Sequence, residues 1–396
     1  MFDIDVIIPC YGKSEIISMG IASLMTQWHS EFIHVTLVND CSPNTDCNYQ
    51  DLIDRYGSDL DIRCITTPQN GGQGLARQYG IDNTSHDYFM FMDEDDRLGN
   101  NLAVSMFVGA VEGANIKYNE DGSFNVDENG KPAQKEDAKP VSVVSAPLFE
   151  FDDNHTRVIE NTNRIWLNSK LYSRRFIEKH NVRFNGAQSR HAEDYYWMSC
   201  FFHAMDNDQA YQGILMDNNG IYYLWYPNME SQSRTDADYG YMLSGYTTDG
   251  SVNILKYMRD SERSGIEWTG AVEEQYRQRV LNMTVYSYFT FQSFVRHVAE
   301  TDYVPKLEQD WYILRDACNE LRKMLLEYFD TYTSTKKIEE YHNVKNFTDV
   351  MFTEPWVDFD TYVKEGCDEL KLSFGQLLET KQTMKFNDEG VRIWEK

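Results

Sequence analysis

Four acidic residues follow directly on an apolar run in the segment YFMFMDEDD, residues 88–96. The apolar part is typical of a short strand that is buried on both faces, so we expect the acids at its carboxyl end. Four like charges this close repel one another unless a cation lies among them, and hard divalent cations prefer oxygen ligands. The segment therefore predicts a divalent-cation site, with an acidic surface loop as the alternative.

Two more polar features follow predicted strands. Asp40 ends the strand expected at 33–40, and the glycine-rich run NGGQGLARQYG follows the strand expected at 62–67. Ligands of open α/β sheets bind where parallel strands end, so these features are expected to meet the four acids at one edge. A nucleotide diphosphate needs a carboxylate that accepts hydrogen bonds from the nucleobase or ribose. It also needs a backbone that can approach the phosphates closely and carboxylates that bind a divalent cation, and these features provide all three.

The elements that must position these residues alternate between strand and helix. Strands are expected at 5–9, 33–40, 62–67, 88–92 and 141–151, and helices at 14–28, 48–56, 72–82, 169–180 and 192–205. This rhythm predicts an α/β fold with a mostly parallel, Rossmann-like sheet flanked by helices. Residues 118–140 lack periodicity and are rich in Gly, Asn, Asp and Pro, which indicates a surface insertion with a hairpin around ENGK.

The length of 396 residues predicts two or three domains. We assign residues 1–245 to the α/β domain. From there the pattern changes to long helical segments at 271–300 and 306–332, so residues 246–396 are expected to form a helical domain. Covering the site, recognising the acceptor and forming an oligomer are its candidate roles.

Composition narrows the class of protein. The net charge of -26 repels polyanions from most of the surface, which disfavours a general nucleic-acid or anionic-membrane binder. The seven cysteines are scattered and form no CxxC pair, which is typical of reduced thiols. The sequence contains neither a membrane span nor a recognisable leader, so we expect a cytoplasmic protein.

Taken together, four segments resemble the motif series of family 2 inverting glycosyltransferases, which have the GT-A fold. They are VIIPCYG (6–12), LVNDCSPNT (37–45), NGGQGLARQYGID (70–82) and YFMFMDEDD (88–96). The resemblance spans roughly residues 3–240 and implies hexosyl or pentosyl transfer from a nucleotide sugar, with Mn²⁺ or Mg²⁺ as cofactor. The donor-binding residues that it implies are Pro9, Tyr11, Asp40, Gly72, Arg77 and Asp93, with uridine the usual base.

The resemblance also implies which residues bind the metal and which remove the proton. Asp93 and Asp95 match the family's DxD pair, of which the second residue binds the metal and the first contacts the ribose or metal. In RHAEDYYW (190–197), Asp194 matches the base that deprotonates the acceptor hydroxyl, with Glu193 as the fallback. Carboxylates at a helix start are also common without any catalytic role.

A serine-rich loop is the last motif of the resemblance. The segment YYLWYPNMESQSRT (222–235) is similar to the family's closing segment, in which Ser231, Ser233 and Arg234 would contact the diphosphate. An ordinary surface loop is the alternative.

Positive charge is concentrated just before the predicted base. Residues 164–190 contain seven basic side chains, against Glu178 as the single acid. This asymmetry suggests an anionic acceptor such as a phosphoglycan, a teichoic-type polymer or modified DNA, bound by Arg174, Arg175 and His191. A solvated basic helix, and a histidine that only donates a hydrogen bond, are the alternatives.

Three other functions compete with glycan glycosylation. One is glycosylation of a hydroxylated base in phage-type DNA, and another is a catalytically inactive module that binds a nucleotide sugar. The third, a dinucleotide-dependent oxidoreductase, is disfavoured because Arg77 occupies the third glycine position of its motif and the run follows the third strand.

Overall fold

The computed structural model describes residues 2–12, 16–43, 48–152, 155–164, 166–186, 193–226 and 249–259, with two short strands near the carboxyl terminus. The chain divides into two compact units, residues 1–244 with 256–272 and residues 245–255 with 273–396. Of the second unit, the described elements are β12 (Lys385–Phe386), β13 (Arg392–Ile393) and part of α8 (Asp249–Arg259). The helices expected at 271–300 and 306–332 lie outside the described residues.

A seven-stranded sheet forms the centre of the first unit, in the order β10-β6-β9-β4-β1-β2-β3. Its strands are β1 (Ile4–Cys10), β2 (Ile33–Asn39), β3 (Asp61–Thr66), β4 (Tyr88–Phe91), β6 (Val141–Ser145), β9 (Lys170–Ser173) and β10 (Gln212–Leu215). All pairings are parallel except those of β9, which runs antiparallel to β4 and β6. The predicted mostly parallel sheet is confirmed.

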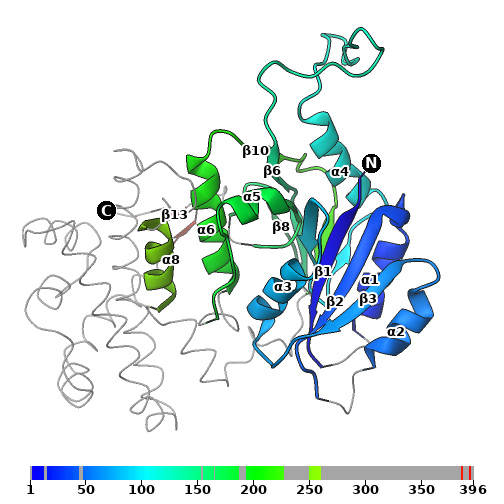
Figure 1. Cartoon of the computed structure of the whole chain (residues 1–396), viewed down its shortest axis with the longest axis vertical. Coiled ribbons are helices and arrows are strands. Elements are labelled where there is room, and N and C mark those ends of the chain that lie inside the picture. The colour runs from blue at the N-terminus through cyan, green and yellow to red at the C-terminus, as the bar shows by residue number, and fades with distance from the viewer. Residues whose placement is uncertain are drawn as a thin grey trace, which may run out of the picture. The chain divides into compact units, whose positions relative to one another are not determined.

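Helices cover both faces of this sheet. They are α1 (Ser18–Met25), α2 (Tyr49–Tyr56), α3 (Gln73–Asp82), α4 (Ala103–Gly113), α5 (Arg174–Lys179) and α6 (Glu193–Asn207). Side chains of β4 alternate between two cores, because Phe89 and Phe91 pack with α3, α5 and α6 whereas Met90 packs with α1, α2 and α4. Figure 1 shows α3 and α6 on one side of β1, and α1 and α2 on the other. Burial on both faces explains the continuous apolar run of β4.

A second, smaller sheet has the strand order β5-β11-β7-β8. It contains β5 (Arg97–Leu98), β7 (Leu148–Asp152), β8 (His155–Ile159) and β11 (Tyr223–Trp225). The single strand predicted at 141–151 is wrong, since β6 and β7 belong to different sheets. Pro147 lies at the break, where it cannot donate a ladder hydrogen bond.

The helix predicted at 169–180 is also wrong in its first half. Residues 170–173 form β9, and the chain turns into α5 only at Arg174. Leu171 and Tyr172 are fully buried in opposite cores, which requires the two-residue period of a strand. The side chain of Ser173 then caps α5 by accepting a hydrogen bond from the backbone N–H of Phe176.

The insertion predicted at 118–140 projects from the domain between α4 and β6 (Figure 1). Antiparallel bridges join Val126 to Pro132 around the expected turn at ENGK and Tyr118 to Phe124 around a second turn at 119–123. Among the described residues, none of the helices is both long enough and apolar enough to cross a bilayer.

Close packing of α3 on the sheet depends on a glycine. A Cβ atom on Gly80 would lie 2.4 Å from Ile7 Cγ2 and 3.1 Å from Val38 Cγ2. We expect Gly80→Ala to lower the free energy of unfolding by about 1–3 kcal/mol in urea denaturation, because the two side chains cannot move apart without strain. The control is Gly109→Ala in α4, where the added Cβ meets nothing within 4 Å and helix propensity should stabilise by up to about 1 kcal/mol. Equal stability of Gly80→Ala and the wild type would contradict this packing.

Candidate active site

We call the side of the sheet at which β1, β2 and β4 end the rim. The opposite edge is the side at which these strands begin. The parallel register places Cys10 beside Asn39 and Ile7 beside Phe91. The chain therefore leaves these strands at neighbouring points, and Tyr11, Asp40 and Asp93 follow directly. Tyr11 is half exposed at 51%, whereas Pro9 is buried within β1.

Asp40 holds the glycine turn that opens α3. Its carboxylate accepts hydrogen bonds from the backbone N–H groups of Gly71 (3.0 Å) and Gly72 (2.7 Å) and from Thr67 Oγ1 (2.9 Å). Asp40 is 3% exposed. Gly72 has a φ of +85°, a conformation that favours glycine. The predicted contact of Asp40 with a base stays a prediction, and the contacts present fix the backbone that would approach the nucleotide.

Arg77 joins two predicted functional segments. Its Nη2 donates to Asp93 Oδ1 at 2.6 Å, and its Nη1 donates to Glu193 Oε1 at 2.7 Å. The side chains of Arg77 and Glu193 are each 4% exposed, against 29% for Asp93. One buried guanidinium thus ties α3 to the acidic turn after β4 and to the first residue of α6.

The charges of this group depend on burial and on one another. Burial lowers the pKa of Arg77, but Asp93 and Glu193 outweigh it and raise the pKa, so the guanidinium stays charged. Burial raises the pKa of Glu193, against the opposing effect of Arg77. Burial also raises the pKa of Asp194, whose Oδ1 accepts a 2.7 Å hydrogen bond from the backbone N–H of Tyr195.

The acidic turn is anchored to the smaller sheet. The hydroxyl of Tyr223 donates to Asp96 Oδ2 (2.7 Å) and accepts from the backbone N–H of Asp93 (3.1 Å). Asn168 Nδ2 donates to Asp93 Oδ2 at 2.9 Å. Asp96 is buried, which together with Asp93 and Asp95 raises its pKa well above the usual range. Neither Asn168 nor Tyr223 was predicted as a site residue; the tyrosine-rich segment at 222–226 signals Tyr223 only as part of a strand.

The acidic turn fits a hard divalent cation. Asp93 and Asp95 are both partly exposed at the rim and offer carboxylate oxygens, the donors that Mn²⁺ and Mg²⁺ prefer. Each carboxylate oxygen of Asp93 already accepts one hydrogen bond, from Arg77 and from Asn168, which fixes its orientation at the rim. Between them, Glu94 Oε2 accepts from the backbone N–H of Tyr11 at 3.2 Å, and burial raises the pKa of Glu94 to about 8.

Arg174 and Arg175 are not brought to the rim. Arg174 is 8% exposed, and its guanidinium donates to the backbone oxygens of Ile81 and His86 and to Asp5 Oδ2. Asp5 lies near the start of β1, so the guanidinium of Arg174 lies at the opposite edge of the sheet from the rim. Arg175 is exposed on α5, next to Arg174.

Most described cations of the basic segment are neutralised or buried within the chain. Arg164 pairs with Asp206, Lys179 with Asp208 and Arg183 with Asp82, while Lys170 is 2% exposed and donates to the backbone oxygen of Trp166. The anionic acceptor surface inferred from charge therefore does not form from these residues. His191, Ser231, Ser233 and Arg234 lie outside the described residues.

The bridge of Arg77 is expected to be essential for stability. Arg77→Met leaves Asp93 and Glu193 without their cation, so we expect a loss of about 3–5 kcal/mol in the free energy of unfolding. The matched control is Arg183→Met, whose ion pair with Asp82 is about half exposed (52% and 42%) and should contribute about 0–1 kcal/mol. Urea denaturation of both variants measures the difference, and similar losses would contradict the assigned importance of the buried bridge.

Burial of Lys170 makes stability depend on pH. The pKa of Lys170 is lowered by burial to about 7 from an ordinary 10.5, so the unfolded chain binds more protons than the folded chain between these values. The contribution of Lys170 to stability therefore rises as pH increases from 7 towards 10, by up to about 1.4 kcal/mol per pH unit. We expect Lys170→Met to remove this rise, measured as denaturation midpoints at pH 7 and pH 9. The same pH dependence in both proteins would disprove the effect.

Part of the chain is similar in sequence to known glycosyltransferases. Residues 5–180 match the family model for glycosyl transferase family 2. Over 127 residues the chain is 32% identical to Glycosyltransferase GlyA of Streptococcus pneumoniae serotype 4, covering 32% of this chain and 18% of GlyA. The chain therefore spans less than a fifth of that curated relative.

Solved structures share the fold. The chain is similar to residues 1–349 of S. aureus TarS in complex with UDP-GlcNAc, with a TM-score of 0.55 and 14% identity over 88% of this chain and 91% of that chain. For the same TarS fragment with UDP, the TM-score is 0.52 with 13% identity over 92% of both chains. Residues 5–180 thus match the model of glycosyl transferase family 2, and the chain shares its mixed α/β fold with the TarS fragment.

Proposed function

We propose that the chain transfers a sugar from a UDP-sugar to an acceptor hydroxyl, with inversion at the anomeric carbon. One observation carries the proposal: Arg77 holds the acidic turn, through Asp93, next to the start of α6, through Glu193. This bridge supports the proposal because it would fix the proposed diphosphate site and the proposed proton acceptor relative to each other. UDP is the proposed nucleotide because the structurally similar TarS fragment binds UDP and UDP-GlcNAc.

The donor site is proposed at the ends of β1 and β2 and at the glycine turn. The half-exposed ring of Tyr11 gives a base an apolar surface, beside the backbone of Pro9. Gly72 is the N-cap residue of α3, and backbone N–H groups at the start of a helix favour phosphate. Asp40 supports this site by holding the turn, and Arg77 positions Asp93.

The proposed cofactor is Mn²⁺ or Mg²⁺, held by Asp95 with Asp93. When bound, such a cation offsets the charge that grows on the departing diphosphate. Because Asp93 is fixed by Arg77 and Asn168, the carboxylate would be presented in one orientation before the donor arrives. Preorganisation of this kind lowers the cost of binding.

Asp194 is the proposed base. The Oε1 atom of the neighbouring Glu193 is engaged by Arg77 in a buried ion pair, whereas Asp194 remains partly exposed. The Asp194 carboxylate takes the proton of the acceptor hydroxyl as its oxygen bonds to the anomeric carbon, and the bond from that carbon to the diphosphate oxygen breaks. The products are the glycosylated acceptor, UDP and protonated Asp194. A raised pKa makes Asp194 a stronger base than an ordinary aspartate.

A neutral glycan hydroxyl is the acceptor that we propose. Teichoic-type polymers and modified DNA are anionic, and they were considered because residues 164–190 are rich in basic side chains. Most of the described cations of this segment are paired or buried. The overall charge of -26 also disfavours a polyanion.

Asp194→Asn separates catalysis from binding. We expect this variant to bind UDP-GlcNAc with Mn²⁺ like the wild type, by isothermal titration calorimetry, while UDP release falls by about 10²–10⁴-fold because the base is absent. The companion variant Asp95→Asn should lose the effect of Mn²⁺ on donor binding. Undiminished turnover by Asp194→Asn would exclude Asp194 as the base. A wild-type protein that binds UDP-sugars but never releases UDP would indicate an inactive binding module.

A further inference from the structure

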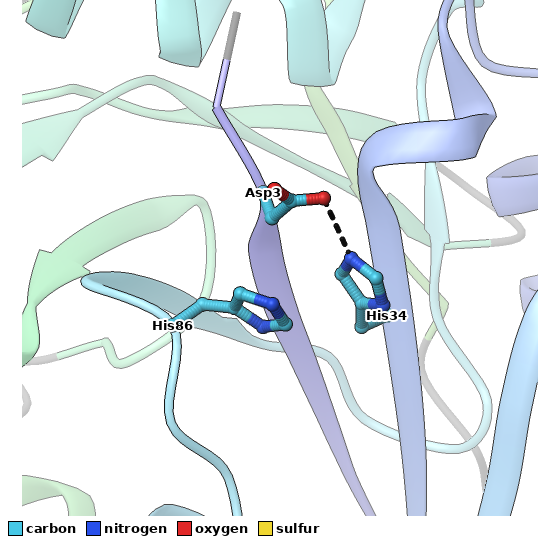
Figure 2. A group of neighbouring side chains, drawn as sticks. All are labelled: Asp3, His34 and His86. Carbon is cyan, nitrogen blue, oxygen red and sulfur yellow. Dashed lines mark hydrogen bonds and ion pairs between the residues drawn. The ribbon is translucent and has the colours of Figure 1, made fainter.

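Two histidines and an aspartate meet at the edge of the sheet opposite the rim. Asp3 precedes β1, His34 lies on β2 and His86 lies in the turn before β4. The register pairs Ile4 with both Ile33 and Tyr88, so it brings these three positions together. One potential ligand atom from each side chain lies within 4.8 Å of those of the other two. Figure 2 shows Asp3 facing His34, with the ring of His86 directed towards them.

Both histidines are oriented by a second layer of carboxylates. His34 Nδ1 lies 2.5 Å from Asp61 Oδ2, and His86 Nδ1 lies 2.8 Å from Asp5 Oδ1. Asp5 is itself fixed by Arg174. For His86, the carboxylate on Nδ1 selects the tautomer in which Nε2 can bind a metal. The Nε2 atom of His34 also faces Asp3, so His34 would release its Nε2 proton when a metal binds. A carboxylate, carbonyl or water on the second ring nitrogen accompanies most histidine ligands.

We propose that Asp3, His34 and His86 bind a divalent transition metal of the Zn²⁺ type. The ligands would be one carboxylate oxygen and two Nε2 atoms, with water completing the coordination. Two imidazoles favour Zn²⁺, Ni²⁺ or Cu²⁺ over Mg²⁺, which separates this site from the oxygen donors of the rim. The side chains are 48%, 27% and 33% exposed for Asp3, His34 and His86, so a metal can reach them from solvent.

Small movements would complete the site. His34 Nε2 and Asp3 Oδ1 are 2.8 Å apart, and a tetrahedral metal with bonds of about 2.0–2.1 Å needs roughly 3.3 Å between ligand atoms. The two imidazole rings stack with centroids 4.2 Å apart and 22° between planes, so the partly exposed ring of His86 must also turn. A bound metal would then join β1, β2 and the turn before β4, and so stabilise this edge against unfolding.

Metal binding by the full chain tests the proposal. Calorimetric titration of the chelator-treated protein with ZnCl₂ should be made on Asp95→Asn, which removes one of the two ligands proposed at the rim. We expect one Zn²⁺ per chain and a higher melting temperature. His34→Gln and His86→Gln should each weaken binding at least tenfold, and Asp61→Asn about 10–100-fold because it alters the second layer.

A control variant and a second measurement distinguish loss of a metal ligand from misfolding. His29→Gln removes another surface histidine, which pairs with Glu31, and should leave Zn²⁺ affinity unchanged. Electron paramagnetic resonance of bound Cu²⁺ should show two imidazole nitrogens in Asp95→Asn. No Zn²⁺ binding, unchanged affinity in both histidine variants, or Cu²⁺ without imidazole coupling would each overturn the site. None of these readouts depends on sugar transfer.

Discussion

A buried guanidinium between two carboxylates is the interaction on which the rim depends. Arg77 lies on α3, while its partners Asp93 and Glu193 are 16 and 116 residues away along the chain. Removing these charges from water is costly, and the cost is offset only while all three groups keep this geometry. The bridge therefore selects one arrangement of the helix, the acidic turn and α6. Asp95 lies two residues after Asp93, and Asp194 follows Glu193 directly. The bridge therefore also determines where Asp95 and Asp194 lie.

The rim and the opposite edge of the sheet differ in what their polar side chains hold in place. At the rim, Asp40 and Tyr223 hold backbone segments by hydrogen bonds, so that partly exposed groups are presented on a rigid frame. At the opposite edge, Arg174 joins α3, the turn before β4 and the start of β1. An arginine buried there contributes to packing, and the same frame orients His86 through Asp5.

Local sequence patterns predicted β1 to β4 and α1 to α3 because each of these elements carries its own signal, but they did not predict α4 or β10. The run at 88–92 is apolar because β4 is covered on both faces, and the glycine turn before α3 follows from the sequence NGGQG. The two strands β6 and β7 were merged because a short apolar run does not reveal a change of sheet. The strand β9 was missed because four residues show too little periodicity.

The residues of the rim were predicted from short motifs, but their interactions were not. Arg77 was expected to seat the nucleotide, whereas it contacts two carboxylates of its own chain. Asn168 and Tyr223 contact Asp93 from 75 and 130 residues away, a distance at which a single sequence carries no signal. Arg174 was misassigned because charge counting does not distinguish a buried cation from an exposed one.

The most direct test of the rim as a donor site is the anomalous diffraction signal of Mn²⁺ in crystals grown with UDP. The arrangement around Arg77 predicts a manganese peak bonded to the carboxylate of Asp95, with the diphosphate beside it at the ends of β1 and β4 and Asp194 facing the same space. A manganese peak and UDP found away from Asp95, with the rim left open, would contradict it.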